Sequence, residues 1–470
     1  MKAQTISDKA MVKLIHGDRF TPFSLCNKLD AKALLESASF EQGRGRYSIL
    51  LVREAFSVFE TKEGLFIRKE GRDSPLERSG RDILDRLLAF ADQHAGTDRR
   101  FPYPAGGIGY LSYDYAFRFD DIKAEPKPDF LGVPEAYFIF GHVYLIFDHY
   151  TDTISILGLN YDEHRIDLAK AIAETEERIN DLDFNYLIQP SRSYEAALLT
   201  KDGERERFID GVEKMRKEII KGNLLQGVLS RRAYVRSEIP AIEAYRRLRS
   251  LNPSPYMFYL DLGEFQLFGA SPEIHVKWDG EKVVIRPLAG TRRRGKTNQE
   301  DRALEAELRA DVKERAEHLM LVDLARNDLG RVSRAGSVRV SGSMDVERYA
   351  YVMHLVSQVE GELAPGMSGI DAIRATFPAG TVSGAPKIRA MEIISALEKE
   401  KRGFYAGLVG YIEPGGTLDT CITIRSALKN DDILVLQAGA GIVYDSIPER
   451  EYVETSAKLE AMSRALGVEV

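Results

Sequence analysis

Short apolar runs joined by tight turns recur along both halves of this 470-residue chain, and they limit its possible folds more than any other feature. Residues 55–60 and 65–68, on either side of Lys62-Glu63-Gly64, are typical of a β-hairpin. Segments with helical periodicity separate groups of these apolar runs, but strands and helices do not alternate singly along the chain. Strands grouped by hairpins and broken by helices indicate an α+β fold and argue against an alternating parallel sheet.

We expect a strand-rich N-terminal part at residues 1–182 and a C-terminal part at residues 196–466, with the polar segment 183–195 as the boundary. We expect the two parts to form one intertwined structural unit. The main expected helices are 79–94, 163–182, 204–221, 298–327, 368–376, 386–400 and 451–465. The main expected strands of the C-terminal part are 225–235, 256–262, 265–269, 283–287, 407–412, 419–428 and 433–437.

Composition narrows the class of protein. Hydrophobic residues make up 44% and charged residues 29%, as in globular proteins, and the net charge of -7 disfavours a nucleic-acid partner. Cys26 and Cys421 are far apart and match no zinc or CxxC spacing, which fits a reducing cytoplasm. The longest apolar run, residues 136–147, is too short to cross a bilayer, and the first residues lack a signal-peptide core.

Residues 437–443 contain a Gly-Ala-Gly sequence that predicts a tight turn with exposed backbone N–H groups. Such groups can form a nest for an anion. Glu454 and Lys458 follow, one helical turn apart, and offer a ligand for a hard cation and a positive charge. The segment therefore suits a small dianionic substrate held through a metal ion. The alternative is an ordinary turn before a helix that carries an i,i+4 ion pair.

Glu314 and Glu317 are three residues apart in a predicted helix, so their side chains are neighbours on one face. The rest of that helix is largely apolar. Two carboxylates on such a helix can hold Mg²⁺ while water and substrate oxygens complete the octahedron. The alternative is an exposed acidic face that pairs with Lys313 and Arg315.

Three further features leave both a structural and a functional interpretation open. His354 lies among apolar neighbours and is either a core residue or a proton-transfer group. Residues 377–387 form a Gly- and Pro-rich segment that loosely resembles an anion-binding loop but lacks P-loop spacing. Arg425, in the predicted strand 420–425, is either a surface residue or a fork for a carboxylate.

Taken together, these segments resemble the chorismate-utilising enzyme family, and most of all the large subunits of its anthranilate-forming branch. The motifs that carry the resemblance are residues 286–292, 314–328, 351–354, 380–387 and 419–422. They occur in the family's order, and the resemblance covers nearly the whole chain. It implies a large α+β fold in which two antiparallel sheets form a sandwich flanked by helices.

The resemblance implies a reaction in which ammonia adds to C2 of chorismate, the 4-hydroxyl leaves and pyruvate is eliminated to give anthranilate. Glu317 and Glu454 match the positions that hold Mg²⁺, with Glu314 and Glu451 behind them. Glu273 matches the general acid for the departing hydroxyl, which needs a carboxyl whose pKa is raised by burial. His354 would assist pyruvate elimination, and Glu314 and Gln226 complete the catalytic set. The implied substrate-binding residues are Gly290, Thr291, Thr381, Tyr405, Arg425, Gly439, Ala440, Gly441 and Lys458.

Gln226 distinguishes branches of the family. Isochorismate- and salicylate-forming relatives carry a lysine at this position as the base that activates water. A neutral glutamine cannot deprotonate water, so ammonia is the expected nucleophile. Neither cysteine lies in the Gly-x-Cys-x-Gly motif of a glutaminase, which implies a separate glutamine amidotransferase subunit and a hetero-oligomer.

Two alternatives remain. One is the aminodeoxychorismate-forming branch, many members of which carry a nucleophilic lysine where this chain has Ala289. The other is a non-catalytic relative that senses tryptophan or an aromatic acid, although its metal-binding glutamates would be expected to be damaged.

Residues 33–38 match the segment at which the family binds tryptophan as a feedback inhibitor, and residues 252–258 match the opposite wall. Ser37 would bond the polar groups of the ligand, and Pro255, Tyr256 and Met257 would cover the indole. The full implied set is Glu36, Ser37, Pro255, Tyr256, Met257 and Cys421. The segment 42–48 stands where relatives often carry a longer insertion, so the residue that grips the amino-acid group stays undetermined.

Overall fold

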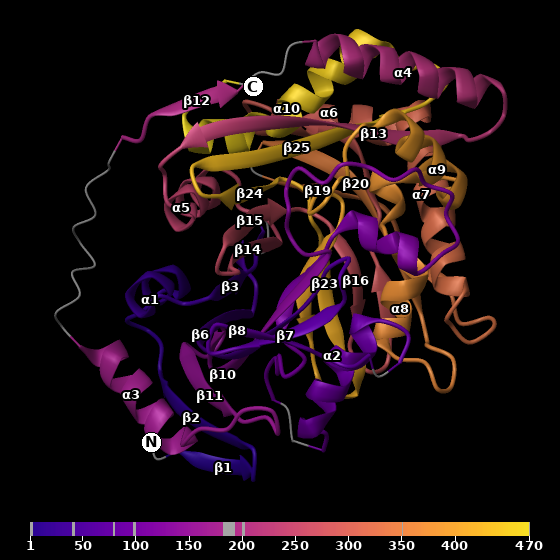
Figure 1. The fold of residues 1–470 in the computed structure, drawn as a ribbon. Coiled ribbons are helices and arrows are strands. Elements are labelled where there is room, and N and C mark those ends of the chain that lie inside the picture. Colours follow the sequence, from indigo (N-terminus) through magenta and orange to yellow (C-terminus); the bar gives the residue numbers. More distant parts are fainter. Residues whose placement is uncertain are drawn as a thin grey trace.

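The computed structural model describes residues 3–39, 43–78, 80–96, 100–181, 193–199, 203–349 and 351–469. Its strands form a continuous antiparallel network with helices outside it (Figure 1). This confirms the predicted α+β class with antiparallel sheets flanked by helices. The proposed boundary at 183–195 lies mostly outside the described residues.

The first sheet mixes strands from both ends of the chain, and every pair in it is antiparallel. In spatial order its strands are β1 (Gln4–Ser7), β2 (Ala10–His16), β11 (Thr153–Leu159), β10 (Ala136–Asp148), β6 (Tyr47–Glu60), β3 (Ala33–Glu36), β14 (Tyr256–Asp261), β15 (Phe265–Ser271), β24 (Ser426–Asn430), β25 (Ile433–Ile442), β13 (Gln226–Ser237) and β12 (Ala196–Leu199). The N-terminal β3 therefore pairs directly with the C-terminal β14.

The second sheet branches from the same strand β10, because the first residues of β10 pair with β9 while its last residues pair with β11. From β10 the order is β9 (Ile108–Leu111), β22 (Leu408–Ile412), β23 (Leu418–Ile422), β16 (Ile274–Trp278), β17 (Val283–Ile285), β20 (Val352–Gly361) and β19 (Arg339–Arg348), with β18 (Leu288–Arg293) beside β20. The register of the β10–β6 pair shifts around Gly141, where the two sheets diverge.

The remaining strands are short. They are β7 (Leu65–Lys69) and β8 (Arg72–Pro75), which extend β6, β21 (Gly384–Ala385), which pairs with β13, and the separate pair β4 (Ala38–Ser39) and β5 (Gly43–Arg44). The helices are α1 (Pro22–Leu29), α2 (Ile83–Ala91), α3 (Leu168–Asn180), α4 (Glu204–Ile220), α5 (Ala241–Leu251), α6 (Asn298–Ala310), α7 (Val312–Gly330), α8 (Gly369–Thr376), α9 (Lys387–Leu397) and α10 (Pro448–Leu466). The 3₁₀ turns are η1 (Asp92–His94), η2 (Tyr113–Arg118), η3 (Gly380–Val382) and η4 (Pro414–Gly416).

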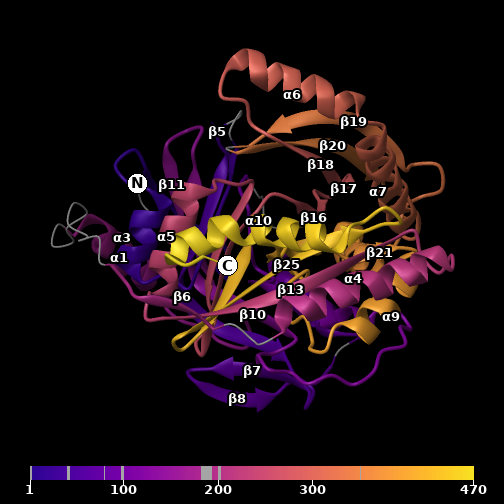
Figure 2. The ribbon, with the colours of Figure 1, turned by 90° about the horizontal axis from the view of Figure 1, so that it is seen from above.

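Two large hydrophobic clusters occupy the interior. The first lies around β6, β9, β10 and α2, where the ring centroids of Phe56 and Phe140 are stacked 4.6 Å apart. The second lies beneath α1, α3, α5 and α10, on the other side of the first sheet. Figure 2 shows α10 running along β25 and β13, with α4 beside it. No described helix is long and apolar enough to cross a bilayer.

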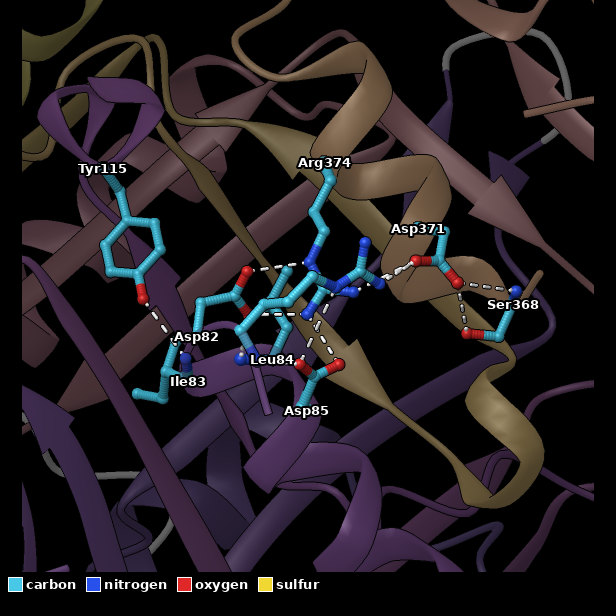
Figure 3. A network of polar contacts seen from close by, with 9 residues as sticks. Asp82, Ile83, Leu84, Asp85, Tyr115, Ser368, Asp371 and Arg374 are labelled. Atoms are coloured by element: carbon cyan, nitrogen blue, oxygen red, sulfur yellow. Dashed lines mark hydrogen bonds and ion pairs between the residues drawn. The ribbon is translucent and has the colours of Figure 1, made fainter. Parts of the chain in front are cut away.

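A buried polar network joins α2, from the N-terminal part, to α8, from the C-terminal part (Figure 3). The guanidinium of Arg374 donates to both carboxylate oxygens of Asp82 at 2.7 Å and to Asp85 at 2.7 Å. It also contacts Asp371, which completes a capping box with Ser368 at the start of α8. Asp82 in turn caps α2 by accepting from the backbone N–H of Leu84. One arginine thus ties the starts of two helices together.

Candidate active site

The predicted Gly-Ala-Gly turn is wrong, because residues 439–441 lie inside β25 and pair with β13. The two glycines are needed for space and not for an unusual backbone conformation. A Cβ on Gly439 would lie 2.9 Å from the Tyr405 hydroxyl, and a Cβ on Gly441 would lie 2.4 Å from the amide nitrogen of Gln226. The strand therefore brings Gln226 and Tyr405 against bare backbone. Ala440 packs its side chain into the cluster beneath α4 and α9 instead.

Lys458 and Glu454 lie on α10, alongside this strand. The Lys458 ammonium donates to the carbonyl of Gly439 at 2.8 Å and pairs with the Glu454 carboxylate at 2.8 Å. The predicted i,i+4 pair is present, and the same lysine also binds β25. Lys458 thereby joins α10 to β25, the strand whose residues 439–441 are expected to bind the substrate.

Glu273 occupies the short connection between β15 and β16 and is 6% exposed. Burial raises its pKa from 4.5 to about 8, although the Thr381 hydroxyl, the backbone N–H of Leu288 and the charge of Lys458 all oppose the shift. The carboxyl is therefore protonated at neutral pH. A carboxylic acid that keeps its proton at pH 7 can serve as a general acid.

His354 lies on β20, directly opposite Thr291 of β18. Its Nδ1 is 3.0 Å from the carbonyl oxygen of Gly290, and because a carbonyl only accepts, Nδ1 carries the proton and Nε2 is the basic nitrogen. Burial, together with the positive charges of Arg425 and Lys458, lowers the pKa of His354 to about 4. Gly290 has φ of +64°, a conformation that suits glycine and turns its carbonyl toward the ring.

Arg425 does not lie in a strand as predicted. β23 ends at Ile422, and Arg425 has φ of +53° in the break before β24. One of its nitrogens donates to the carbonyl of Lys458 at 3.2 Å. Among the ion pairs of the described residues, none involves Arg425. A partly buried guanidinium without a carboxylate partner is a ready site for an anionic ligand.

The predicted helix 298–327 is two helices, because Asp311 ends α6 and caps α7. The Asp311 side chain accepts from the backbone N–H groups of Lys313 and Glu314, which is the typical arrangement of an N-cap. Arg292 of β18 then donates to Asp311 at 2.7 Å and to Glu314 at 3.0 Å. Glu314 is therefore held by an arginine at the base of α7.

Glu317 faces the carboxylates of α10. Burial raises its pKa; Lys313 opposes this shift, and the negative charges of Glu314, Glu454 and Glu451 add to it. Carboxylates that repel one another fit a divalent cation, which would relieve the repulsion. Among the described residues, no three His, Cys, Asp or Glu side chains are close enough to hold a metal ion by themselves. Water and substrate oxygens would have to complete the coordination of an ion held by Glu317 and Glu454.

The Gly- and Pro-rich segment 377–387 does not present its lysine to a ligand. The Lys387 ammonium is buried, where it donates to Asp328 at 2.6 Å and to the carbonyl of Thr376 at 2.8 Å. It anchors the end of α7 and is structural. Thr381 instead lies near Glu273. The Thr381 hydroxyl and the Gln226 amide oxygen are buried and have no well-aligned hydrogen-bond partner in the described part of the chain.

The expected tryptophan-binding residues gather elsewhere, in the wall of one cavity of about 580 Å³. All six of them line it: Glu36, Ser37, Pro255, Tyr256, Met257 and Cys421. The cavity continues to Pro272 and Ile274, on either side of Glu273, and to Val356, on the same strand as His354. The segment 40–42, which includes the start of the shortened insertion, lies outside the described residues.

The Glu36 carboxylate is turned away from a ligand in this cavity. It accepts from Arg249 at 2.8 and 3.0 Å and from the Tyr245 hydroxyl at 2.8 Å, and only 2% of its side chain is exposed. Glu36 therefore holds β3 against α5. On the opposite wall, the Tyr256 hydroxyl donates to Asp419 at 2.9 Å, and Lys277 pairs with the same carboxylate at 2.8 Å.

Sequence reasoning missed the arginines that support these groups. Arg402, which is 2% exposed, donates to the carbonyls of Val228 and Val382 at 2.6 and 2.8 Å and forms an ion pair with Glu398. Arg292 was missed in the same way. The available signal was position alone: Arg402 precedes Tyr405 by three residues, and Arg292 follows Thr291.

Comparison with known proteins agrees with this arrangement. The model of a family described as chorismate binding enzyme matches residues 43–464. The chain is 57% identical to anthranilate synthase component 1 of Spirochaeta aurantia, over 98% of this chain and 96% of the relative. It is 39% identical to aminodeoxychorismate synthase component 1 of Bacillus subtilis, over 92% and 91%. The solved anthranilate synthase component I from Streptococcus pneumoniae TIGR4 superposes with a TM-score of 0.79 at 37% identity, covering 89% of this chain and 92% of that one. The chain belongs to the chorismate binding enzyme family.

Proposed function

We propose that this protein is the large component of an anthranilate synthase, a lyase that converts chorismate and ammonia into anthranilate and pyruvate for tryptophan biosynthesis. The observation that carries the proposal is a pair of opposite pKa shifts within one cationic cluster. Glu273 holds its proton up to about pH 8, and His354 stays neutral down to about pH 4. Groups whose pKa values are pushed apart in this way are suited to be the acid and the base of one reaction.

The residues divide the reaction between them. Ammonia adds to C2 of the ring, and Glu273 gives its proton to the departing 4-hydroxyl, which leaves as water. The basic nitrogen of His354 then accepts the C2 proton of the ring while the C–O bond to the side chain breaks. The released enolpyruvate takes up a proton at its methylene carbon and becomes pyruvate. The positive charges of Arg425 and Lys458 both lower the pKa of His354. These two side chains would bind the substrate carboxylates.

Gln226 supports ammonia as the nucleophile. Its side chain lies against Gly441 and cannot act as a base toward water. We infer that a separate glutamine amidotransferase subunit supplies the ammonia, which makes the working enzyme a hetero-oligomer in the cytoplasm. The relatives named as component 1 support a partner subunit.

We propose Mg²⁺ as the cofactor, held by Glu317 and Glu454 with Glu314 and Glu451 behind them. The mutual repulsion that raises the pKa of Glu317 supports this assignment. When bound, the ion would neutralise the ring carboxylate and lower the cost of charge change at the neighbouring carbon. We also propose tryptophan as a feedback inhibitor, bound in the cavity between Ser37 and Met257.

The test is purified chain with chorismate, Mg²⁺ and ammonium chloride, followed by fluorescence and mass analysis of the products. Anthranilate together with pyruvate is the expected result. The relative from Bacillus subtilis favours one alternative, aminodeoxychorismate synthesis in the folate pathway. A product that carries nitrogen but keeps its enolpyruvyl group would establish that alternative, and chorismate left unchanged would reject both.

A further inference from the structure

The triplet Ser230-Arg231-Arg232 of β13 has no part in the reaction proposed above. Successive side chains of a strand point to opposite faces. Ser230 accordingly bonds Glu398 through its backbone N–H and hydroxyl at 2.9 and 2.8 Å, and Arg232 pairs with Glu400 at 2.9 Å. Both lie on the face toward the segment that leads to Tyr405. Arg231 points the other way, toward α10.

Arg231 grips α10 at adjacent positions. Its Nε donates to the Thr455 hydroxyl at 2.6 Å, and its Nη2 donates to the Ser456 hydroxyl at 2.6 Å. The guanidinium also lies 4.4 Å from the ring centroid of Tyr452 and 3.6 Å from Glu204 of α4. Only 4% of the Arg231 side chain is exposed. A planar guanidinium holds its acceptors in one rigid fork, whereas an ammonium on its flexible stem fixes no such geometry.

The residues that Arg231 holds are not those that face the reaction. At about 100° per residue, Glu451, Glu454 and Lys458 form one stripe along α10. Tyr452, Thr455 and Ser456 lie on a neighbouring stripe, roughly a third of a turn away. A rotation of α10 about its own axis would therefore move Glu454 and Lys458 off the Glu273 and His354 cluster. Arg231 resists this rotation without touching either of them.

We propose that Arg231 is a positioning residue, which sets the rotation of α10 and so aims Glu454 and Lys458 at the bound substrate. The inference rests on the proposed function, because that function gives the two side chains their roles. The same strand begins at Gln226, so β13 links the site of the nucleophile to the site of the substrate carboxylate.

The test compares Arg231→Lys with Arg236→Lys, an exposed arginine on the same strand that pairs only with Asp432 among the described residues. Binding of chorismate with Mg²⁺ and no ammonia is measured by calorimetry, beside kcat and the melting temperature. For Arg231→Lys we expect a Kd weaker on the order of tenfold, as when groups that support a ligand-binding residue are removed. The kcat should change by less than about threefold, because the lost contacts hold the bound substrate and the transition state equally. Arg236→Lys should match the wild type in all three.

Thr455 separates positioning from general packing. Thr455→Ser keeps the acceptor and should retain the wild-type Kd, whereas Thr455→Val should weaken chorismate binding as Arg231→Lys does. The double variant Arg231→Lys, Thr455→Val should bind no more weakly than the worse single variant, because both remove one link. Wild-type affinity in folded Arg231→Lys, or fully additive losses, would overturn the inference. Wild-type enzyme that binds chorismate but makes no anthranilate would overturn the proposed function alone. The Kd values of the wild type and the variants could still be compared in that case.

Discussion

Glu273 is a carboxyl that the fold holds in its protonated form, and this has a cost in stability. Below about pH 4.5 Glu273 is protonated in both the folded and the unfolded chain, so its ionisation does not change the free energy of unfolding. Between 4.5 and about 8 only the unfolded chain releases the proton, so the folded state loses stability as pH rises. Above about 8 the penalty is constant.

Glu273→Gln should therefore stabilise the protein while removing its activity. At pH 7 we expect a gain on the order of 3 kcal/mol in the free energy of unfolding, which vanishes below pH 4.5. We expect a loss of about 10²- to 10⁴-fold in kcat, typical of a missing general acid. Urea denaturation at pH 4 and pH 7, with anthranilate formation, measures both.

Glu360 provides the opposite control. Arg339 and Lys282 hold the pKa of this carboxyl at about 2 against its burial, so Glu360→Gln should destabilise the protein at pH 7. The contribution of Glu360 is present above its ordinary pKa of 4.5 and is lost as pH falls toward 2. Equal effects of the two substitutions at pH 7 would contradict the protonated state assigned to Glu273.

The pH dependence of the wild-type enzyme should show the same two groups. The proposed mechanism requires protonated Glu273 and neutral His354, so kcat/KM should fall below about pH 4 and above about pH 8. The measurement must be expressed per free ammonia, because total ammonium supplies more nucleophile as pH rises. A profile still flat about one pH unit above the upper limit would contradict the role of Glu273 as the acid.

Among the elements, α2 and α8 depend on a single buried arginine. Arg374 serves three carboxylates (Figure 3). Its removal would leave the buried Asp82 without an ion-pair partner among the described residues, and would leave Asp371 and Asp85 with only the exposed Arg81. Arg374→Met should lower the free energy of unfolding by about 3–5 kcal/mol, measured by urea denaturation at pH 7.

Arg389→Met is the matched control for Arg374→Met. Arg389 pairs on the surface of α9 with Glu392 at 2.8 Å, and 45% of its side chain is exposed. Its loss should cost less than about 0.5 kcal/mol. A loss below about 1 kcal/mol for Arg374→Met would show that the three carboxylates find other partners.

Local patterns predicted most elements but not where they break. The hairpin at residues 55–68 and helices α4, α8 and α10 follow from periodicity and caps. The break at Asp311 did not, because helical periodicity continues across it. From the sequence alone, the glycines of β25 indicate a turn. Their actual role is to leave space for Tyr405 and Gln226, which are distant in sequence and could not be paired with them. Arg231 and Arg402 could not be assigned for the same reason.

At the scale of the whole molecule, the cavity that we propose for tryptophan is built from both halves of the chain. Gly45 lies against Ser37, and a Cβ on Gly45 would come within 2.6 Å of the Ser37 side chain. Gly45→Ala should displace Ser37 and weaken tryptophan binding on the order of tenfold, about 1.4 kcal/mol. The reaction without tryptophan should be unaffected. Calorimetric titration with tryptophan provides the measurement.

Gly330→Ala makes the same chemical change at the end of α7, where a Cβ meets nothing within 4 Å, and should leave tryptophan affinity unchanged. Unaltered affinity in Gly45→Ala would place tryptophan away from Ser37. The order of motifs predicted the residues of both sites from the sequence. It did not predict that the cavity extends to the neighbours of Glu273 and to the strand of His354, because segments distant in sequence form its wall.

The sharing of β10 between two sheets has a consequence for synthesis. When the ribosome has made the first 160 residues, β9 can pair with β10. The other edge of β9 stays unpaired until β22 is made, some 300 residues beyond β9. Until then an open strand edge and the apolar face beside it remain exposed to other nascent chains. Closure through such distant contacts is slow. The nascent chain is therefore exposed to aggregation for longer than a chain whose strands pair in the order of synthesis.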